Sequence, residues 1–513
     1  MQKSDFIESK KNIIIIFGLL FILGLTIRLY FTPFNLPISL DGIDYFAYAI
    51  AMSREGIFPS GYLLTNFGWP SFVSIFFTFA KDTDMITLMD LQRILSIIIS
   101  TLTIIPIYLL TKIFFRKQIA LLATILFLFD PRIIENSISG IADSLFILLA
   151  ISTILFVFYK KSSLIYLSFI FVALSAFVRY EGIVLIIPLL VSYVIKNKQE
   201  KIPNIKLLIG ISLFLIIIIP INFINYENTE QTSIFSQIVH RGDFISGTII
   251  ENKPDIDDEF FATNENHTII FIENAVGGFV KYLGWILIPT SIIFCVLGII
   301  FMPKKITKNK IIFGLFFIFL ALSSIFAYGR GFQETRYLLV LLPIITLLSC
   351  YGLNYLLKSN LKNVVVVIIF AIISSSFIFI DYRNQDSKYE LEMYEATIFL
   401  TNIAQGVNDY SGNQYVKVAN LQNNWPELLD KGINGKMELG TKKFVIKGFN
   451  EPEEYIKLNK NKGLTHLLVN ENDKFFEDVY INEKNYSNLE KIYDSNNFNK
   501  NIKYKIFKIN NEE

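Results

Sequence analysis

Two acidic residues lie close together just after the first strongly apolar segment. Asp41 and Asp44 stand in the stretch ISLDGIDYFAYAIAMSREG, and Tyr48 and Arg54 follow them. Two carboxylates that approach each other shift each other's pKa, and one of them can then take a proton from a hydroxyl group. The pair is therefore a candidate for general-base catalysis. A solvated helix cap is the alternative interpretation of an aspartate at this place.

Arginine and glutamate recur together at the ends of later apolar segments. FVRYEGIVL contains Arg179 and Glu181, and YGRGFQETRYLLVLLP contains Arg330, Glu334 and Arg336. A guanidinium group is planar and always charged, so it suits the binding of a phosphate or diphosphate. The alternative is that these arginines extend towards lipid headgroups and pair with the neighbouring glutamates.

Two further groups of polar residues are weaker candidates for a site. Asp143 lies a few residues inside the apolar segment of NSISGIADSLFILL, where an acid is costly and indicates a partner or a site unless it caps the helix end. His240 and His267 share a long polar stretch with several aspartates. A divalent metal site is conceivable there, but no metal-ligand spacing is recognisable, so no metal site is predicted.

The elements that must position these residues are membrane helices. Of the 513 residues, 52% are hydrophobic and 18% are charged, which is more apolar surface than a soluble core of this size needs. About 20 apolar residues in a helix cross a bilayer. The sequence predicts about eleven such spans, near residues 12–31, 91–112, 117–130, 140–159, 163–178, 182–195, 206–224, 281–302, 311–328, 337–357 and 363–380.

The charge of the connecting loops predicts which side of the membrane each loop faces. Lysine and arginine gather in alternate loops, near residues 112–117, 160–161, 196–206, 304–310 and 358–362, as in cytoplasmic loops. With the odd number of spans, this pattern puts the N-terminus in the cytoplasm and the C-terminus outside. The net charge of only +2 and the short basic clusters argue against nucleic-acid binding.

The outward side carries two long loops and the C-terminal part of the chain. The loops are residues 32–90 and 226–280, and the first contains SFVSIFFTFA, which is too short to span and is interpreted as an interfacial or re-entrant helix or as packing of the loop onto the bundle. Residues 1–382 form the predicted membrane domain. Residues 383–513 form a predicted extracytoplasmic α/β domain, because β-type runs (YVKVANL, KKFVIKGF, THLLVNE, YKIFKI) alternate with helix-like segments at 389–403 and from Glu451.

At these residues the sequence resembles the C-type membrane glycosyltransferases, especially the branch of dolichyl-phosphate-mannose protein mannosyltransferases and bacterial aminoarabinose transferases. The matching elements are Asp44, Tyr48 and Arg54 after the first helix, NFGWPSF, IADSLFILL, FVRYEGIVLIIPLL and ETRYLLVLLP, in the family's order. The family commonly has Asp-Glu where this chain has Asp44-Tyr45. That departure leaves open which of the two aspartates is the principal carboxylate.

The resemblance implies a fold and an activity. The fold is an all-α polytopic membrane bundle with a C-terminal α/β domain. The activity is transfer of a single sugar from a polyprenyl (dolichyl) phosphate donor to an acceptor hydroxyl of a protein, lipid or glycan at the extracytoplasmic face. Asp44, helped by Asp41, is the implied base; the implied ligands of the donor phosphate are Arg54, Arg179, Arg330 and Arg336; the supporting residues are Asp143, Glu181, Tyr48 and Glu334.

Two related functions are weighed against this one. Oligosaccharyltransferases of the same superfamily carry Trp-Trp-Asp in the C-terminal domain, and Asn424-Trp425-Pro426 does not match it, so transfer of a whole oligosaccharide is disfavoured. A flippase or transporter of lipid-linked sugars also needs many helices and intramembrane charges. The absence of an internal repeat and the gathering of charges at one membrane face favour an enzyme.

Overall fold

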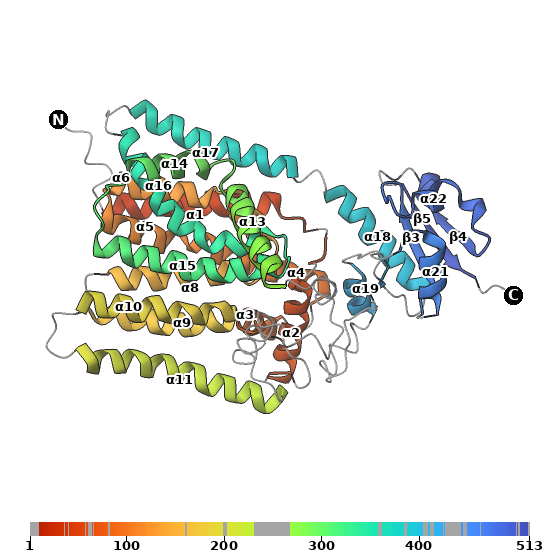
Figure 1. The fold of residues 1–513 in the computed structure, drawn as a ribbon, viewed down its shortest axis with the longest axis horizontal. Coiled ribbons are helices and arrows are strands. Elements are labelled where there is room, and N and C mark those ends of the chain that lie inside the picture. The colour runs from red at the N-terminus through yellow and green to blue at the C-terminus, as the bar shows by residue number, and fades with distance from the viewer. Residues whose placement is uncertain are drawn as a thin grey trace.

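The structure is a computed structural model of the chain. It describes residues 10–34, 36–38, 41–56, 58–59, 64, 66–80, 83–159, 162–197, 203–229, 267–357, 362–383, 387–403, 409–410, 415–423, 425, 443–444, 449–461, 463–498, 500 and 503–510. The fold is a mostly helical bundle with a small domain that contains a β-sheet at its C-terminal end (Figure 1).

Apolar helices that run side by side make the bundle (Figure 1). They are α1 (Lys10–Phe31), α4 (Met85–Leu102), α5 (Ile104–Phe114), α6 (Lys117–Leu128), α8 (Asp143–Phe158), α9 (Ile165–Val178), α10 (Ile186–Asn197), α11 (Pro203–Thr229), α14 (Ser291–Phe301), α15 (Lys308–Gly329), α16 (Leu342–Leu356) and α17 (Lys362–Arg383). Short 3-10 turns precede α9, α10 and α16: η2 (Ser162–Leu164), η3 (Tyr180–Leu185) and η5 (Thr335–Leu341).

The helices confirm a multi-pass membrane protein. In the part of the chain that the structure describes, seven helices are long and apolar enough to cross a bilayer, and several others are apolar but shorter. Each of the eleven predicted spans contains a helix. The start of α1 and the C-terminal domain lie at opposite ends of the bundle (Figure 1). We call the end next to the C-terminal domain the domain-side end.

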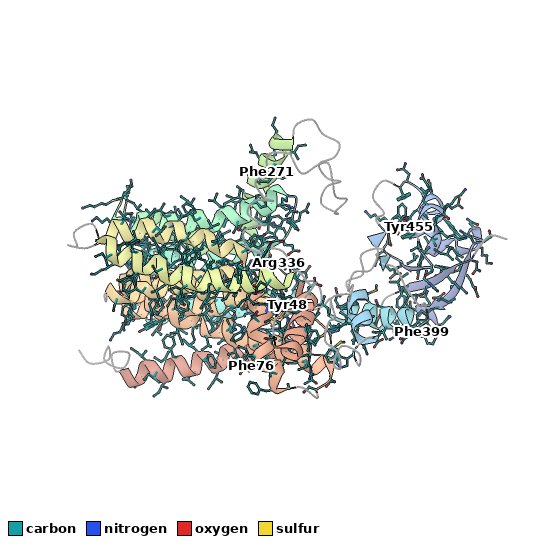
Figure 2. All side chains as sticks on the ribbon, turned by 90° about the horizontal axis from the view of Figure 1, so that it is seen from below. Tyr48, Phe76, Phe271, Arg336, Phe399 and Tyr455 are labelled. Carbon is teal, nitrogen blue, oxygen red and sulfur yellow. The ribbon has the colours of Figure 1, made fainter. Side chains whose placement is uncertain are left out.

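Several helices lie at the domain-side end in addition to the spans. α2 (Asp41–Glu55) and α3 (Gly68–Phe79) occupy the loop predicted at 32–90, α7 (Pro131–Ile138) follows α6, and α13 (His267–Leu287) runs across the bundle axis in both views (Figures 1 and 2). α3 is the helix predicted in SFVSIFFTFA. It buries Trp69, Val73 and Phe77 and leaves Phe79 86% exposed, so it packs on the bundle and also presents an apolar face outward.

One predicted span is two helices in the structure and not one. The sequence predicts one helix over residues 281–302, but α13 ends at Leu287 and α14 begins at Ser291, and α13 starts inside the predicted outward loop 226–280. Pro289 lies at the break and has no backbone N–H to continue a helix. Of that loop, residues 230–266 lie outside the described residues, including His240 and the aspartates beside it.

The C-terminal domain combines helices with an antiparallel sheet. Its helices are α18 (Ser387–Ile403), α19 (Val416–Asn423), α21 (Pro452–Lys460) and α22 (Glu477–Ile481), with turns η8 (Glu483–Asn485) and η9 (Ser495–Phe498). Its strands are β1 (Asp409–Tyr410), β2 (Lys443–Phe444), β3 (His466–Asn470), β4 (Leu489–Asp494) and β5 (Tyr504–Ile509). The sheet has the order β3-β5-β4, with Leu468 opposite Ile506, and β1 pairs with β2 in parallel.

The α/β character of this domain is confirmed, with one strand misassigned. The run YVKVANL is predicted as a strand, but it forms α19. Val418, Ala419 and Leu421 are buried in this helix, and Tyr415 is buried just before it. Tyr415, Val418 and Ala419 have the i, i+3, i+4 spacing of a helix face. β3 and β5 lie where strands are predicted, whereas β4 has no counterpart among the predicted strands.

A buried arginine holds the first helix to the bundle. Arg28, in the last turn of α1, is 0% exposed. Its guanidinium group donates to the carbonyl oxygens of Gly24 and Leu128, each at 3.1 Å. Because buried donors need partners, these bonds specify where α1 meets the end of α6.

Candidate functional site

Acidic and basic residues from four separate segments meet at the domain-side end of the bundle. They come from the first turn of α2, the start of α8, the segment between α9 and η3, and the segment that leads into η5. Figure 2 shows Arg336 at this end, on the side that faces the C-terminal domain. The segments form two groups, which we call the Arg179 cluster and the Arg336 cluster.

The Arg179 cluster is buried. The Arg179 guanidinium group contacts the Asp143 carboxylate through Nη1 and Glu181 Oε1 through Nη2, the latter at 3.4 Å. Asn136, on α7, donates to the other Asp143 oxygen at 3.1 Å. The three charged side chains are 13%, 5% and 8% exposed in the order Arg179, Asp143, Glu181, and the space beside them is only about 10 Å³.

The Arg336 cluster is open. Arg336 Nη1 lies 2.7 Å from Asp41 Oδ2, and Arg336 Nε contacts the Glu334 carboxylate. Asp41 and Glu334 are nearly half exposed. The Tyr337 ring joins the two clusters, because the Arg179 and Arg336 guanidinium carbons lie 5.6 Å and 5.3 Å from its centroid. The structure thus brings together six of the predicted site residues: Asp41, Asp143, Arg179, Glu181, Glu334 and Arg336.

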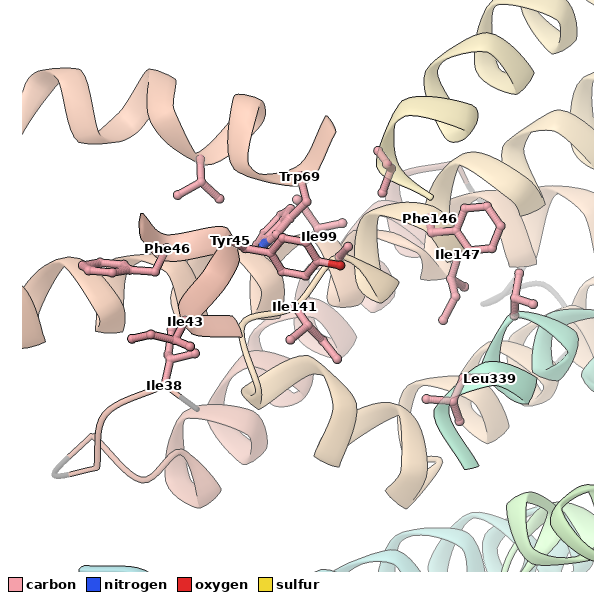
Figure 3. Close-up of a cluster of buried hydrophobic side chains, with 14 of the residues drawn as sticks. Ile38, Ile43, Tyr45, Phe46, Trp69, Ile99, Ile141, Phe146, Ile147 and Leu339 are labelled. Atoms are coloured by element: carbon pink, nitrogen blue, oxygen red, sulfur yellow. The ribbon is translucent and has the colours of Figure 1, made fainter. Parts of the chain in front are cut away.

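Tyr45 belongs to this region and is not among the predicted site residues. Its ring lies beside Trp69 and its hydroxyl points towards the side of Phe146 on α8 (Figure 3). Burial raises the pKa of Tyr45, and the negative charges of Asp41 and Asp143 raise it further. The phenol therefore keeps its proton and remains a hydrogen-bond donor. The only signal in the sequence is its position directly after Asp44.

A cavity of about 460 Å³ adjoins the Arg336 cluster. Asp41, Glu334 and Arg336 line it, and its volume is typical of small-molecule sites. α7 contributes Arg132, Glu135 and Asn136 to the wall, α4 contributes Arg93, and the C-terminal domain contributes Glu390 and Tyr415.

Side chains of α4 hold the backbone that carries Asp41. Arg93 donates to the carbonyl oxygens of Leu36 and Pro37, at 2.6 Å and 3.0 Å. Gln92 donates to the carbonyl oxygens of Gly42 and Gly140, at 3.2 Å and 2.8 Å. These bonds link α2, α4 and the α7–α8 turn, so they fix the direction in which Asp41 enters the cavity.

Four further residues belong to the predicted site: Asp44, Tyr48, Arg54 and Arg330. Asp44 is half-buried in the first turn of α2, and Tyr48 is fully buried in the same helix. Arg54 lies 13 residues after Asp41, a separation of about 20 Å along a helix. Arg330 lies at the end of α15, with its guanidinium carbon 5.5 Å from the Phe332 ring centroid. None of these four lines the 460 Å³ cavity.

The described residues contain no group of three histidine, cysteine or acidic side chains that could hold a metal ion. The residues around His240 lie outside the described part of the chain. The sequence assigns no chemistry to the C-terminal domain, so Glu390 and Tyr415 are not among the predicted site residues.

The comparisons with known proteins agree with this architecture. The family model described as dolichyl-phosphate-mannose-protein mannosyltransferase matches residues 88–223. No curated protein matches the chain. The family match therefore covers α4 to α11, including Asp143, Arg179 and Glu181, and leaves the first two-aspartate segment outside it.

Two solved structures share the fold of this chain. The oligosaccharyltransferase AglB from Archaeoglobus fulgidus, in complex with an inhibitory peptide and a dolichol-phosphate, is 11% identical with a TM-score of 0.55, over 90% of this chain and 70% of that chain. ArnT from Cupriavidus metallidurans, bound to undecaprenyl phosphate, is 9% identical with a TM-score of 0.50, over 98% of both chains. The predicted resemblance to C-type membrane glycosyltransferases is confirmed at the level of the fold.

Proposed function

We propose that this protein is a membrane glycosyltransferase that moves a single sugar from a polyprenyl-phosphate donor to an acceptor hydroxyl at the domain-side face of the membrane. The observation that supports this most directly is the placement of Asp41 and Arg336 together on a 460 Å³ cavity. A carboxylate and a guanidinium group side by side supply the two charges that glycosyl transfer from a phosphate requires.

The reaction assigns one role to each charge. As the acceptor oxygen bonds to the anomeric carbon, its proton passes to an α2 carboxylate, and the bond from that carbon to the phosphate oxygen breaks. The polyprenyl phosphate leaves with the electron pair. Arg336 binds its growing negative charge, because a guanidinium group offers two parallel N–H donors to a phosphate.

We assign the base to Asp44, as the family resemblance implies, and the positioning of Arg336 to Asp41. The ion pair at 2.7 Å supports the role of Asp41. Asp44 lies one turn further along α2, on the same side as Asp41, since residues i and i+3 are neighbours on a helix. The proposed role of the Arg179 cluster is to support Arg336. The contact runs through the Tyr337 ring, which lies against both guanidinium groups. The roles of Tyr48, Arg54 and Arg330 remain predictions from the resemblance.

The proposed donor sugar is a hexose. Mannose is the first to test, because the matching family model is described by a mannose-dependent activity. Transfer of one sugar, not of an oligosaccharide, is supported by the departure of Asn424-Trp425-Pro426 from Trp-Trp-Asp. We also propose that the domain-side face is extracytoplasmic. The loops rich in lysine and arginine connect the spans at the opposite end of the bundle, and such loops are usually cytoplasmic.

The test is sugar transfer by the purified protein in lipid nanodiscs, with radiolabelled polyprenyl-phosphate hexoses as donors. Asp44→Asn should lower kcat by about 100-fold to 10,000-fold, the usual contribution of a general base. Asp41→Asn should mainly raise KM for the donor. Asp84→Asn is the matched control, since Asp84 caps the start of α4 and Asn caps equally well.

Three results would contradict the proposal or its assignment of roles. Unchanged kcat in Asp44→Asn would remove the assigned base, and a large kcat loss in Asp41→Asn would transfer the role to that residue. Failure with every donor, together with movement of donor lipid across the bilayer, would favour a flippase.

A further inference from the structure

Two residues of the C-terminal domain form a hydrogen-bonded pair at the bundle. Tyr415, which directly precedes α19, donates from its hydroxyl to Glu390 Oε2 on α18 at 2.7 Å. Tyr415 is 3% exposed. Figure 1 shows α18 and α19 between the bundle and the sheet of this domain. The pair therefore belongs to the part of the domain that lies next to the bundle.

Both residues line the same cavity as Asp41 and Arg336. The domain is held there by a second contact, because the Trp425 ring stacks on the Phe46 ring of α2 with centroids 6.0 Å apart. α2 is the helix that carries both candidate carboxylates of the reaction. The domain thus contributes Glu390 and Tyr415 to the cavity lining, and α2 contributes Asp41, one helical turn before Asp44.

The charges of the cavity wall favour a neutral ligand. Arg336 pairs with Asp41, Arg132 lies 3.3 Å from the Glu135 carboxylate, and Arg93 lies 3.1 Å from that of Asp90. Each of these three arginines is therefore paired with an acid, and Asp41 and Glu135 also line the cavity. A carboxylate accepts hydrogen bonds from hydroxyl groups, and a phenol both donates to them and accepts from them. A compact ligand with many hydroxyls suits this lining better than a second anion.

We propose that this cavity is the acceptor site and that Tyr415 and Glu390 bind the hydroxyl groups of a saccharide acceptor. The inference rests on the proposed function, since the acceptor must reach the α2 carboxylates that take its proton. The C-terminal domain then selects the acceptor, while the bundle binds the donor.

The test separates the acceptor site from the donor site by two measurements on the full-length protein in nanodiscs. One is release of sugar from a polyprenyl-phosphate hexose to water without acceptor, and the other is transfer to p-nitrophenyl hexosides. Tyr415→Phe and Glu390→Gln should each raise KM for the hexoside about tenfold, the loss of one or two hydrogen bonds. Release to water should stay within about twofold of wild type, because the donor contacts are unchanged.

Matched control variants are available in the same domain. Tyr394→Phe removes a hydroxyl that donates to Gln422 at 3.0 Å, and Glu395→Gln removes a carboxylate that contacts Lys500. Neither residue lines the cavity. Both controls should keep the wild-type KM for the hexoside.

Three results would overturn the inference. The first is a KM for the hexoside in Tyr415→Phe and Glu390→Gln that equals the KM of the controls. The second is an equal fall, in these variants, of the rates of sugar release to water and of sugar transfer. The third is transfer to a serine- and threonine-containing peptide but to no hexoside. If the protein accepts none of the donors, saturation-transfer NMR with the same hexosides still tests whether they bind, because it needs no turnover. Signals in wild type that Tyr415→Phe weakens support the acceptor site even if the proposed reaction fails.

Discussion

The two arginine clusters use the same residue types in different surroundings. Arg179, Asp143 and Glu181 are all at most 13% exposed, and the space beside them is about 10 Å³. Arg336 is 21% exposed, its two acids are nearly half exposed, and they border a cavity of about 460 Å³. Each arginine contacts two carboxylates, so the difference lies in solvent access and not in composition.

This difference separates a supporting role from a binding role. Removing one partner of a buried ion pair leaves an uncompensated charge, whereas an exposed pair contributes little to stability. The Arg336 side chain can therefore exchange a carboxylate for a ligand phosphate at small cost. Arg179, which the sequence also predicts as a phosphate ligand, has no space for one unless its neighbours move.

The largest expected effect is on stability in the buried cluster. Asp143→Ala should lower the free energy of unfolding by about 3–5 kcal/mol, because Arg179 loses a buried partner. Asp41→Ala should lower it by less than about 1 kcal/mol. Denaturant unfolding of the detergent-purified proteins measures both. Equal losses would show that burial does not distinguish the clusters.

The next effect is on donor binding in the open cluster. Arg336→Gln should raise KM for the polyprenyl-phosphate hexose by about 10-fold to 100-fold, the value of a lost charged hydrogen bond of about 1.5–3 kcal/mol. Its melting temperature should stay close to that of wild type. Arg116→Gln, at the start of α6 and far from the cavity lining, is the control. A stability loss as large as that of Asp143→Ala would contradict a binding role.

A smaller effect is expected at the tyrosine near both clusters. Tyr45→Phe should lower kcat/KM up to about tenfold, because one hydrogen-bond donor is lost. The buried phenol stays protonated, since its pKa is raised. The variant should therefore have the same pH–rate profile as wild type, unlike a variant of the base. Tyr226→Phe, half-exposed on α11, should behave as wild type.

The smallest effect is the response of the ion pairs to salt. A double-mutant cycle of Asp41 and Arg336 should give a coupling of about 0.2–1 kcal/mol that falls between low and high salt. The coupling of Asp143 and Arg179 should hardly change, because buried pairs are screened much less. A salt-dependent coupling in the buried pair would show that water reaches it.

The membrane fold can be predicted from the sequence, because a bilayer restricts the length and composition of the segments that cross it. Apolar length and the alternation of basic loops locate a helix in every predicted span. The errors occur where these rules are weak. The break at Pro289 interrupts an apolar run, and the eight residues of α19 are too few for a helix period to stand out from a strand period.

Part of the candidate site can be predicted from the sequence for a related reason. Charges at the ends of spans are costly and therefore noticeable, so the sequence alone singles out Asp143, Arg179 and Arg336. It does not single out Glu390 and Tyr415, because a polar residue in a polar domain gives no such signal. Their position depends on how the domain contacts α2, hundreds of residues earlier in the chain.

The buried arginine of the first helix bears on the order in which the protein assembles. α1 leaves the ribosome first, but the Leu128 carbonyl that accepts from Arg28 is made 100 residues later. An arginine in a membrane helix costs about 2.5–3.5 kcal/mol at the centre and less near the end. α1 can therefore make this contact only after α6 has been synthesised, so its position in the bundle is fixed later than its place in the sequence suggests.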